Sequence, residues 1–239
     1  MFPQTRTSVV GDLGSADPAA RAAAYDALAR SYWQPVYAYI RLRRRRTPEE
    51  AQDLTQDFFT RVLEREYLSG YDPSRARFRT FVRTCLDGFL ANADQSAARL
   101  KRGGGFLIDR VDFARFDADF AAHARCDEPD PERWLQREWV RALFAGAVDQ
   151  LRTVCDERGH ARAFLLFARY DLDADGNGPR DTYAALAVEM GLPVTTVTNE
   201  LAWARRVFRT VVLDRLRGVC TSDAEFRAEA RDLLGIDPP

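Results

Sequence analysis

The sequence predicts an all-α protein with two small helical domains joined by an acidic linker. Apolar residues recur at helical spacing through most of the 239 residues, which is the pattern of helices with one buried face. Prolines preceded by acidic or hydroxyl residues mark several helix starts. Three consecutive glycines and an acidic stretch interrupt the helical pattern near the middle of the chain. We therefore predict a flexible N-terminus (1–16), a first domain (17–102), a linker (103–133), a second domain (134–217) and a C-terminal helical extension (218–239).

Composition and charge narrow the class of protein. The formal net charge is −1, with basic residues in excess in the first half and acidic residues in the middle. No apolar run approaches the roughly 18 residues of a membrane span, and the first residues, MFPQTRTSVVGDLGS, lack a signal-peptide pattern. The four cysteines include no C-x-x-C pair, as is typical of reduced thiols. We expect a cytoplasmic protein with no membrane association and no cofactor.

Helix-start signals indicate where the helices of the first domain begin. Asp17 followed by Pro18 is typical of an N-cap and a first helical residue. Pro35 is expected to end this helix and to begin another. Thr47-Pro-Glu-Glu50 has the form of a capping box, and the helix that it opens is predicted to run to about residue 66.

One side of that helix is apolar and the other is acidic. The polar side carries Glu50, Asp53, Gln56 and Asp57, which helical spacing places on one face. Such a stripe is either a solvated face or a surface that docks to basic groups. A phosphate on Thr55 would add negative charge to this helix.

A turn with the sequence YDPSRARF leads from residue 71 into another helix with a broad apolar face. Guanidinium groups bind phosphates and exposed rings stack on unpaired bases, so interleaved arginines and phenylalanines form a candidate nucleic-acid surface. The alternative is a helix with its phenylalanines in the core and its arginines in water. The residues concerned are Arg75, Arg77, Arg79, Phe81 and Arg83.

The second half of the chain carries a helix-turn-helix pattern. In TYAALAVEMGLPVTTVTNELAWARR, a small residue, a glycine and an apolar residue stand at Ala187, Gly191 and Val197. The alanine permits close approach of two helices, and the glycine forms the turn. Two packed helices without a DNA-binding role are the alternative.

Two metal sites can be drawn from residue spacing. The segment YDLDADGNGPRDTY places Asp171, Asp173 and Asp175 as in a calcium loop, but Thr182 stands where the closing glutamate belongs. The alternative is an acidic loop before a helix capped by Asp181 or Thr182. A two-histidine, two-cysteine zinc site has only loose spacing and would use His123, Cys126, Cys155 and His160. We predict neither metal.

Together these segments resemble the extracytoplasmic-function (ECF) sigma factors, the two-domain class of bacterial RNA polymerase specificity subunits. The resemblance is carried by AQDLTQDFFTRVL at 51–63, YDPSRARFRTFVRTCLDGFLAN at 71–92 and TYAALAVEMGLPVTTVTNELAWARR at 182–206. These are similar to the acidic helix of sigma region 2, the promoter-melting helix that follows it, and the promoter-reading helix-turn-helix of region 4. The resemblance implies a region 2-like bundle and a region 4-like helix-turn-helix domain.

The resemblance also implies a function, namely a transcription initiation factor that binds RNA polymerase core and directs promoter recognition and melting without catalytic residues of its own. The acidic stripe would dock to the beta-prime clamp of the polymerase. Promoter DNA would be held in region 2 by Arg75, Arg77, Arg79, Phe81, Arg83 and Asn92. The region 4 residues implied are Thr195, Thr196, Thr198, Asn199, Arg205 and Arg206.

The expected recognition helix departs from the family in its charge. Where family members often carry a lysine and an arginine, this chain has Thr198 and Glu200, so fewer phosphates would be neutralised. Asn199 can still read adenine, and Glu200 either accepts from cytosine or points away. The alternative function is a sigma-like interaction protein that binds polymerase or a regulator without reading promoters.

Two further classes rank lower. A calcium-sensing helical module would depend on the acidic loop at 171–182. An enzyme is not expected, because the chain has only two histidines, no nucleophile with an evident base, and no phosphate loop in LKRGGGF.

The C-terminal extension is similar to that of a subgroup found in planctomycete-like genomes, some of whose members are associated with serine/threonine kinases. The resemblance implies such a kinase, or an anti-sigma protein, as a regulator. Ser222-Asp-Ala-Glu225 predicts a capped helix that runs to Leu234 and stops at Gly235.

Overall fold

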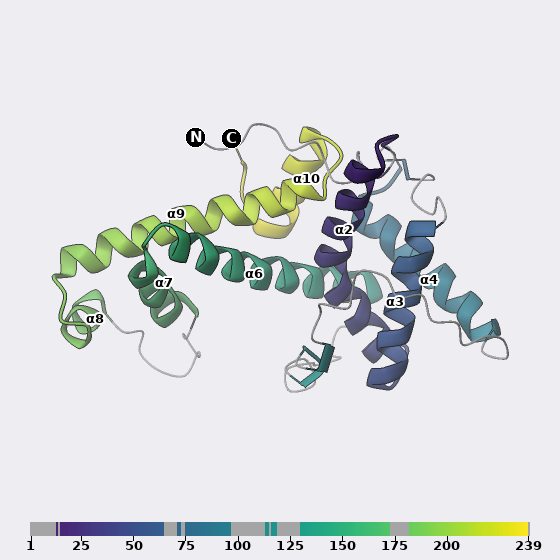
Figure 1. Cartoon of the computed structure of the whole chain (residues 1–239), viewed down its shortest axis with the longest axis horizontal. Coiled ribbons are helices and arrows are strands. Elements are labelled where there is room, and N and C mark those ends of the chain that lie inside the picture. Colours follow the sequence, from purple (N-terminus) through teal and green to yellow (C-terminus); the bar gives the residue numbers. More distant parts are fainter. Residues whose placement is uncertain are drawn as a thin grey trace. The chain divides into compact units, whose positions relative to one another are not determined.

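The structure is a computed structural model, and the part of the chain that it describes is all-helical, as predicted. The described residues are 13, 15–64, 71–72, 75–96, 113–114, 116–118, 130–172 and 182–238. The α-helices, labelled in Figure 1, are α2 (Pro18–Ala38), α3 (Pro48–Glu64), α4 (Phe78–Ser96), α6 (Pro131–Glu157), α7 (Ala161–Phe167), α8 (Tyr183–Glu189), α9 (Val194–Gly218) and α10 (Asp223–Leu234). The described residues also form the π-helical turns η1 (Tyr39–Arg43) and η3 (Ala168–Leu172).

The chain divides into two compact units. Unit 1 comprises residues 1–142 and 216–239, and unit 2 comprises residues 143–215. These boundaries differ from the predicted domain boundaries, because the first residues of α6 and the C-terminal extension belong to unit 1. Trp134 and Trp139 of α6 are almost completely buried there. Burial of two large aromatic side chains explains why this part of α6 packs with the first unit.

Aromatic residues of α2 form the centre of unit 1, where α3 and α4 lie beside that helix (Figure 1). The ring of Tyr32 lies 5.8 Å from that of Phe78 on α4 and 6.0 Å from that of Trp139 on α6. On the inner face of α3, Phe58 contacts Phe89 of α4 at 5.6 Å between ring centroids. These contacts place the acidic helix and the arginine-bearing helix in one packed unit.

The expectation that Pro35 ends a helix is wrong. The helix α2 continues through Pro35 to Ala38, and the wider π-helical turn η1 follows. Proline cannot donate its backbone nitrogen to the ladder and crowds the preceding turn. Tyr32 and Tyr37, on either side of Pro35, are almost fully buried, and this packing offsets the local cost.

The caps predicted from the sequence are present. Asp17 accepts the backbone N–H of Ala19 at the start of α2. In the capping box, the Thr47 N–H donates to the Glu50 carboxylate at 3.0 Å and the Glu50 N–H donates to the Thr47 hydroxyl at 3.2 Å. At the end of the chain, Ser222 caps α10, which ends at Gly235 in the left-handed conformation. These local signals fix where the helices begin and end.

A short piece of the acidic segment predicted as a linker is anchored on unit 1. Phe113 is buried, and its ring lies 5.1 Å from Trp33 and 5.4 Å from Tyr37. Asp117 accepts a hydrogen bond of 2.7 Å from the Tyr37 hydroxyl and one of 3.0 Å from the Arg41 guanidinium. Phe113 and Asp117 are therefore held to α2 and η1 by apolar and ionic contacts respectively.

Unit 2 has its own core beneath a helix, a turn and a second helix. Gly191 takes a φ of +63° between α8 and α9, and the Leu192 N–H donates to the Ala187 carbonyl at 2.8 Å. Ala187 and Val197 are buried, so the helix, turn and helix predicted from 182–206 are present. The buried cluster is Leu151, Cys155, Ala163, Phe164, Leu166, Phe167, Leu186, Ala187, Val197, Leu201 and Ala204.

Gly191→Ala is expected to destabilise unit 2 by about 1 kcal/mol, because a Cβ atom disfavours the left-handed conformation of this residue. Gly88→Ala is the matched control. Gly88 lies inside α4, and a Cβ there meets nothing within 4 Å, so this change should stabilise the chain by roughly 0.5–1 kcal/mol. Denaturant unfolding followed by circular dichroism measures both effects. Equal signs for the two substitutions would contradict the assigned turn geometry.

Candidate functional site

The acidic stripe of α3 lies on an exposed face. Glu50, Asp53 and Asp57 are exposed and Gln56 is half-buried. Glu50 takes part in the capping box and lies 3.9 Å from Arg46. Asp53 makes no ion pair with any residue in the described part of the chain. The face therefore presents negative charge outward, with Asp53 at its centre.

Thr55 lies on the opposite side of α3 from this face, so the proposed phosphate site is wrong for the folded chain. The Thr55 side chain is fully buried, and its hydroxyl donates to the Ala51 carbonyl at 2.6 Å. A hydroxyl in this position is closed to a kinase. Because its proton is already engaged with the preceding turn, the residue serves the packing of α3.

The arginines at the start of α4 differ in their surroundings. Arg75 is exposed and lies 3.3 Å from Asp72. Arg83 is partly buried, lies 3.0 Å from Asp87 and lies 3.8 Å from Glu132. Both side chains pair with neighbours of the same segment or with α6. Exposed pairs of this kind are weak, so water or phosphate can replace the partner at Arg75 at little cost.

Arg77 and Arg79 are held by two carboxylates of α10. Arg79 donates to Glu229 at 2.8 Å and to Asp232 at 2.7 Å. Arg77 pairs with the same two residues, lying 3.5 Å from Glu229 and bonded to Asp232. Hydrogen bonds from Arg79 lower the pKa of Asp232, whereas burial raises the pKa of Glu229 against the opposing effect of the two arginines. Two candidate DNA-binding cations are thus already neutralised.

A third carboxylate of α10 reaches the N-terminus of α4. Glu225 accepts the backbone N–H of Phe78 at 3.2 Å and the hydroxyl of Tyr71 at 2.9 Å. Its other oxygen accepts from the N–H and the hydroxyl of Thr221, both at 2.7 Å. Glu225 therefore caps a helix that starts far away in the sequence, and the charge suits the positive end of that helix.

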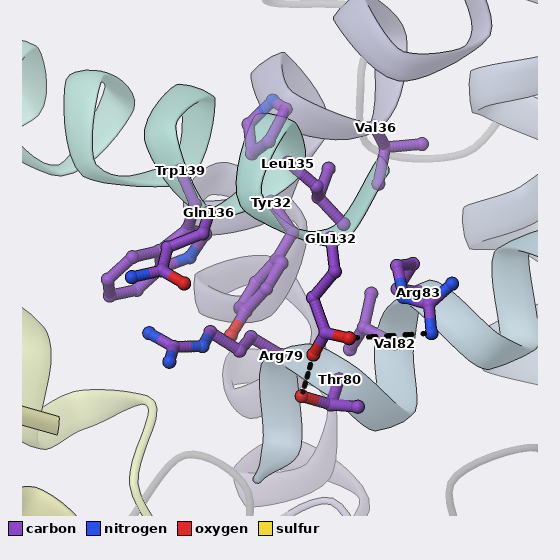
Figure 2. Close-up of a pocket in the computed structure, with 11 residues that line it drawn as sticks. Tyr32, Val36, Arg79, Thr80, Val82, Arg83, Glu132, Leu135, Gln136 and Trp139 are labelled. Carbon is purple, nitrogen blue, oxygen red and sulfur yellow. Dashed lines mark hydrogen bonds and ion pairs between the residues drawn. The ribbon is translucent and has the colours of Figure 1, made fainter. Parts of the chain in front are cut away.

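A small apolar pocket separates the Arg79 and Arg83 side chains, which point to opposite sides of it (Figure 2). Glu132 of α6 lies across this pocket, accepts from the Thr80 hydroxyl at 2.9 Å and approaches Arg83. The walls are formed mainly by Tyr32, Val36, Val82, Leu135 and Trp139. The pocket belongs to the packing of α2, α4 and α6, and both arginines are among its lining residues.

Phe81 and Asn92 follow on α4. Phe81 is half-buried, and its ring lies 5.3 Å from that of Tyr71. Asn92 is exposed. Eleven residues are close to three turns of a helix, so the two residues share a face and lie roughly 16 Å apart along it. The structure therefore separates Asn92 from the arginines at the helix start.

The second helix of the turn presents a polar face. Thr195, Thr198, Asn199 and Arg206 are exposed, and Thr196 is half-buried. Their spacing of three, four, seven and eleven residues places the exposed four on one side of α9. The Thr198 hydroxyl donates to the Val194 carbonyl at 2.9 Å, whereas the exposed Asn199 side chain offers an amide with both donors and an acceptor.

Arg205 is bound within unit 2. Its guanidinium donates to both carboxylate oxygens of Asp171, at 2.9 Å and 2.8 Å, and to the Tyr183 hydroxyl at 2.7 Å. The hydrogen bonds to Asp171 raise the pKa of Arg205. The predicted phosphate contact at this residue would have to displace Asp171, whereas Arg206 is exposed and needs no such exchange.

The ion pair between Arg205 and Asp171 also involves the first residue of the acidic loop at 171–182. Asp171, the first residue of the calcium-like pattern, is paired with Arg205, and Asp173 and Asp175 lie outside the described residues. Thr182 caps α8 by accepting the Ala185 N–H at 3.1 Å. No group of three or more metal-ligating side chains occurs among the residues that could be searched in the described ranges.

Two members of the zinc pattern are visible, and each has another role. Cys155 is buried in the core of unit 2. His160 stacks on Trp203 at 4.0 Å between ring centroids, and its Nδ1 lies 3.5 Å from Glu200. His123 and Cys126 lie outside the described residues. The Glu200 carboxylate therefore lies beside His160 within unit 2.

No protein-family model matches the chain, and comparisons with curated proteins and with solved structures find no match either. None of the helices in the described part of the chain combines the length and apolar character needed to cross a bilayer. The residues and geometry of the chain itself are therefore what point to a function.

The carboxylates of α10 are site residues that the sequence did not reveal. Their signal is present, since Glu225, Glu229 and Asp232 stand at helical spacing on one face of an amphipathic helix. The pattern shows an acidic face without showing what it meets. The partner arginines stand about 150 residues earlier in the chain, beyond the reach of a local pattern.

Proposed function

We propose that this chain is a transcription initiation factor of the ECF sigma type, which binds RNA polymerase core and directs promoter recognition and melting. The observation that carries the proposal is the exposed polar face of α9 behind a glycine turn, with Asn199 and Arg206 outward and Val197 buried. A helix placed in this way after a tight turn is suited to the major groove. The resemblance of three successive segments to the family supports the same function.

Core binding is assigned to the acidic face of α3. Its exposed carboxylates, Glu50, Asp53 and Asp57, offer negative charge at helical spacing to a basic partner. Complementary charges of this kind steer encounter and fix the register of docking. The partner proposed from the resemblance is the beta-prime clamp of the polymerase.

Promoter melting is assigned to the segment that leads into α4 and to the first turns of that helix. Arg75, Arg77, Arg79 and Arg83 would contact the non-template strand through its phosphates, and Phe81 would stack on an unpaired base. Capture of an unstacked base costs a few kcal/mol, which contacts to the protein offset. The chain supplies binding and positioning, and the polymerase performs the chemistry.

Reconstitution with core polymerase tests the proposal. We expect transcripts that start at defined promoter positions, and we expect Asn199→Ala to reduce them by about tenfold, because a bidentate amide contact to adenine contributes about 1–3 kcal/mol of discrimination. Gln150→Ala is the matched control, since Gln150 is exposed on α6 in the same unit. Transcripts that are unchanged by Asn199→Ala would show that this residue does not read the promoter.

A second candidate is a sigma-like protein that binds polymerase or a regulator without reading promoters. It is favoured by one observation, that Arg205 and the pair Arg77 and Arg79 are bound to carboxylates of this chain. Polymerase binding in the same reconstitution without any promoter-specific transcript would identify this function. Absence of polymerase binding would reject the first candidate and would leave only the regulator-binding form of the second.

A further inference from the structure

Helix α10 covers the arginine face of α4 inside unit 1. The side chains of Arg79 and Glu229 are only 12% and 7% exposed where they meet. Asp232 completes the arrangement by accepting from both Arg77 and Arg79. Two cations assigned to the DNA backbone are therefore occupied by acids from the other end of the chain.

The carboxylates of α10 are bound by the same kinds of donor groups that bind phosphate in proteins. Glu225, Glu229 and Asp232 follow one face of α10 and present anionic oxygens to guanidinium groups and to the backbone N–H of Phe78. Guanidinium forks and N–H groups at the start of a helix are also the groups that bind phosphate oxygens. A nucleic-acid strand and α10 would compete for the same donors.

The covering contact is incompletely satisfied. One buried carboxylate oxygen of Glu229, Oε1, accepts no hydrogen bond from the described residues, although Nε of Arg77 lies 3.5 Å from it. A small cavity also remains beneath α10, lined in part by Tyr32, Trp139 and Cys220. Unsatisfied buried oxygens and voids both weaken a contact. Such a contact is suited to being exchanged for another ligand.

We propose that α10 is an intramolecular cover that competes with single-stranded nucleic acid for Arg77 and Arg79. The proposal rests on the proposed function in one respect, the assignment of these arginines to the DNA backbone. DNA then binds only the fraction of molecules whose α10 is displaced, and the apparent affinity falls by that fraction. Release of α10 is the step at which a regulator or the polymerase would act.

Asp232→Lys is expected to tighten binding of a labelled oligothymidylate strand by about tenfold, within the range typical of coupled sites. Asp232 is 42% exposed, so the change is compatible with folding. Asp223→Lys is the matched control, because Asp223 lies on the same helix and pairs with Arg217 rather than with α4. Both variants change the net charge equally. Fluorescence anisotropy of the full chain measures the affinities.

Two further variants distinguish failure of the proposed cover from failure of the DNA assignment. Glu229→Gln should also tighten binding, because it removes the buried charge and keeps the shape. Arg77→Gln with Arg79→Gln should weaken binding and reduce the slope of log K against log salt by about 1.4, the value for two phosphates of a single strand. If this double change leaves affinity and slope unaltered, the DNA assignment of the proposed function fails, and the cover fails with it.

If the arginine changes weaken binding but Asp232→Lys and Asp223→Lys have equal effects, the cover is overturned while the DNA assignment stands. Hydrogen exchange on the unaltered chain gives an independent reading. Adding the oligonucleotide should speed amide exchange across residues 223–234 if the strand displaces α10. Unchanged or slower exchange in this helix would overturn the proposal.

Discussion

Asp53→Arg is expected to lower the affinity of the chain for RNA polymerase core by tenfold or more, with no change in the unfolding midpoint. Asp53 is exposed at the centre of the acidic face, between Glu50 and Asp57. Charge reversal replaces an attraction with a repulsion, and juxtaposed like charges at an interface cost several kcal/mol, while tenfold in affinity is only about 1.4 kcal/mol. The fold should not respond, because Asp53 makes no ion pair with the described residues.

The control for this change is Asp156→Arg, which makes the same charge reversal at an exposed position of α6 in unit 2. Binding to core polymerase is measured for both variants at low and moderate salt, since an exposed charge contact weakens as salt rises. Equal affinity of the two variants would remove the docking role from α3. A loss confined to Asp53→Arg that shrinks at higher salt would support it.

The parts of the fold that could be predicted from the sequence are those set by neighbouring residues. The caps at Asp17, at Thr47 with Glu50, and at Ser222 all act within three residues of the helix start. The same holds for the stop at Gly235. A capping side chain and the N–H groups that it accepts belong to the same few residues, so the sequence carries the whole signal.

Features that depend on distant contacts could not be predicted in this way. Pro35 lies inside α2 because Tyr32 and Tyr37 are buried against residues that are distant in the sequence, which no local pattern contains. From the sequence, Arg79 would be expected to be an unpaired cation. In the folded chain it donates a hydrogen bond to Glu229. Helical spacing assigns a residue to a face, but the partner of that face is decided by the whole chain.

Thr55 is a single residue at which the local sequence pattern and the packing of the whole chain give different expectations. It lies next to Gln56 in a helix whose outer face is acidic, so a phosphate there would be expected to strengthen that face. Consecutive residues of a helix differ by about 100° around its axis. That rotation carries Thr55 into the core, where its hydroxyl donates to Ala51, while Gln56 remains half-buried at the edge of the acidic face.

Thr55→Glu is therefore expected to destabilise unit 1 by about 3 kcal/mol or more, because a carboxylate without a cation would replace a fully buried hydroxyl and would also overfill its site. Thr55→Val should cost only about 1 kcal/mol, the usual contribution of the lost hydrogen bond. Gln56→Glu is the matched control, since it adds the same charge one residue along. Denaturant unfolding followed by circular dichroism ranks the three variants.

The ranking decides how a kinase can act on this helix. If Thr55→Glu alone is strongly destabilised, a phosphate at Thr55 would oppose folding of α3, and any kinase control must use a different residue. If Thr55→Glu and Gln56→Glu are equally stable and Thr55→Glu binds core polymerase more tightly, Thr55 reaches the acidic face and the packing described for it is incorrect. The buried hydroxyl and its 2.6 Å bond to Ala51 predict the first result.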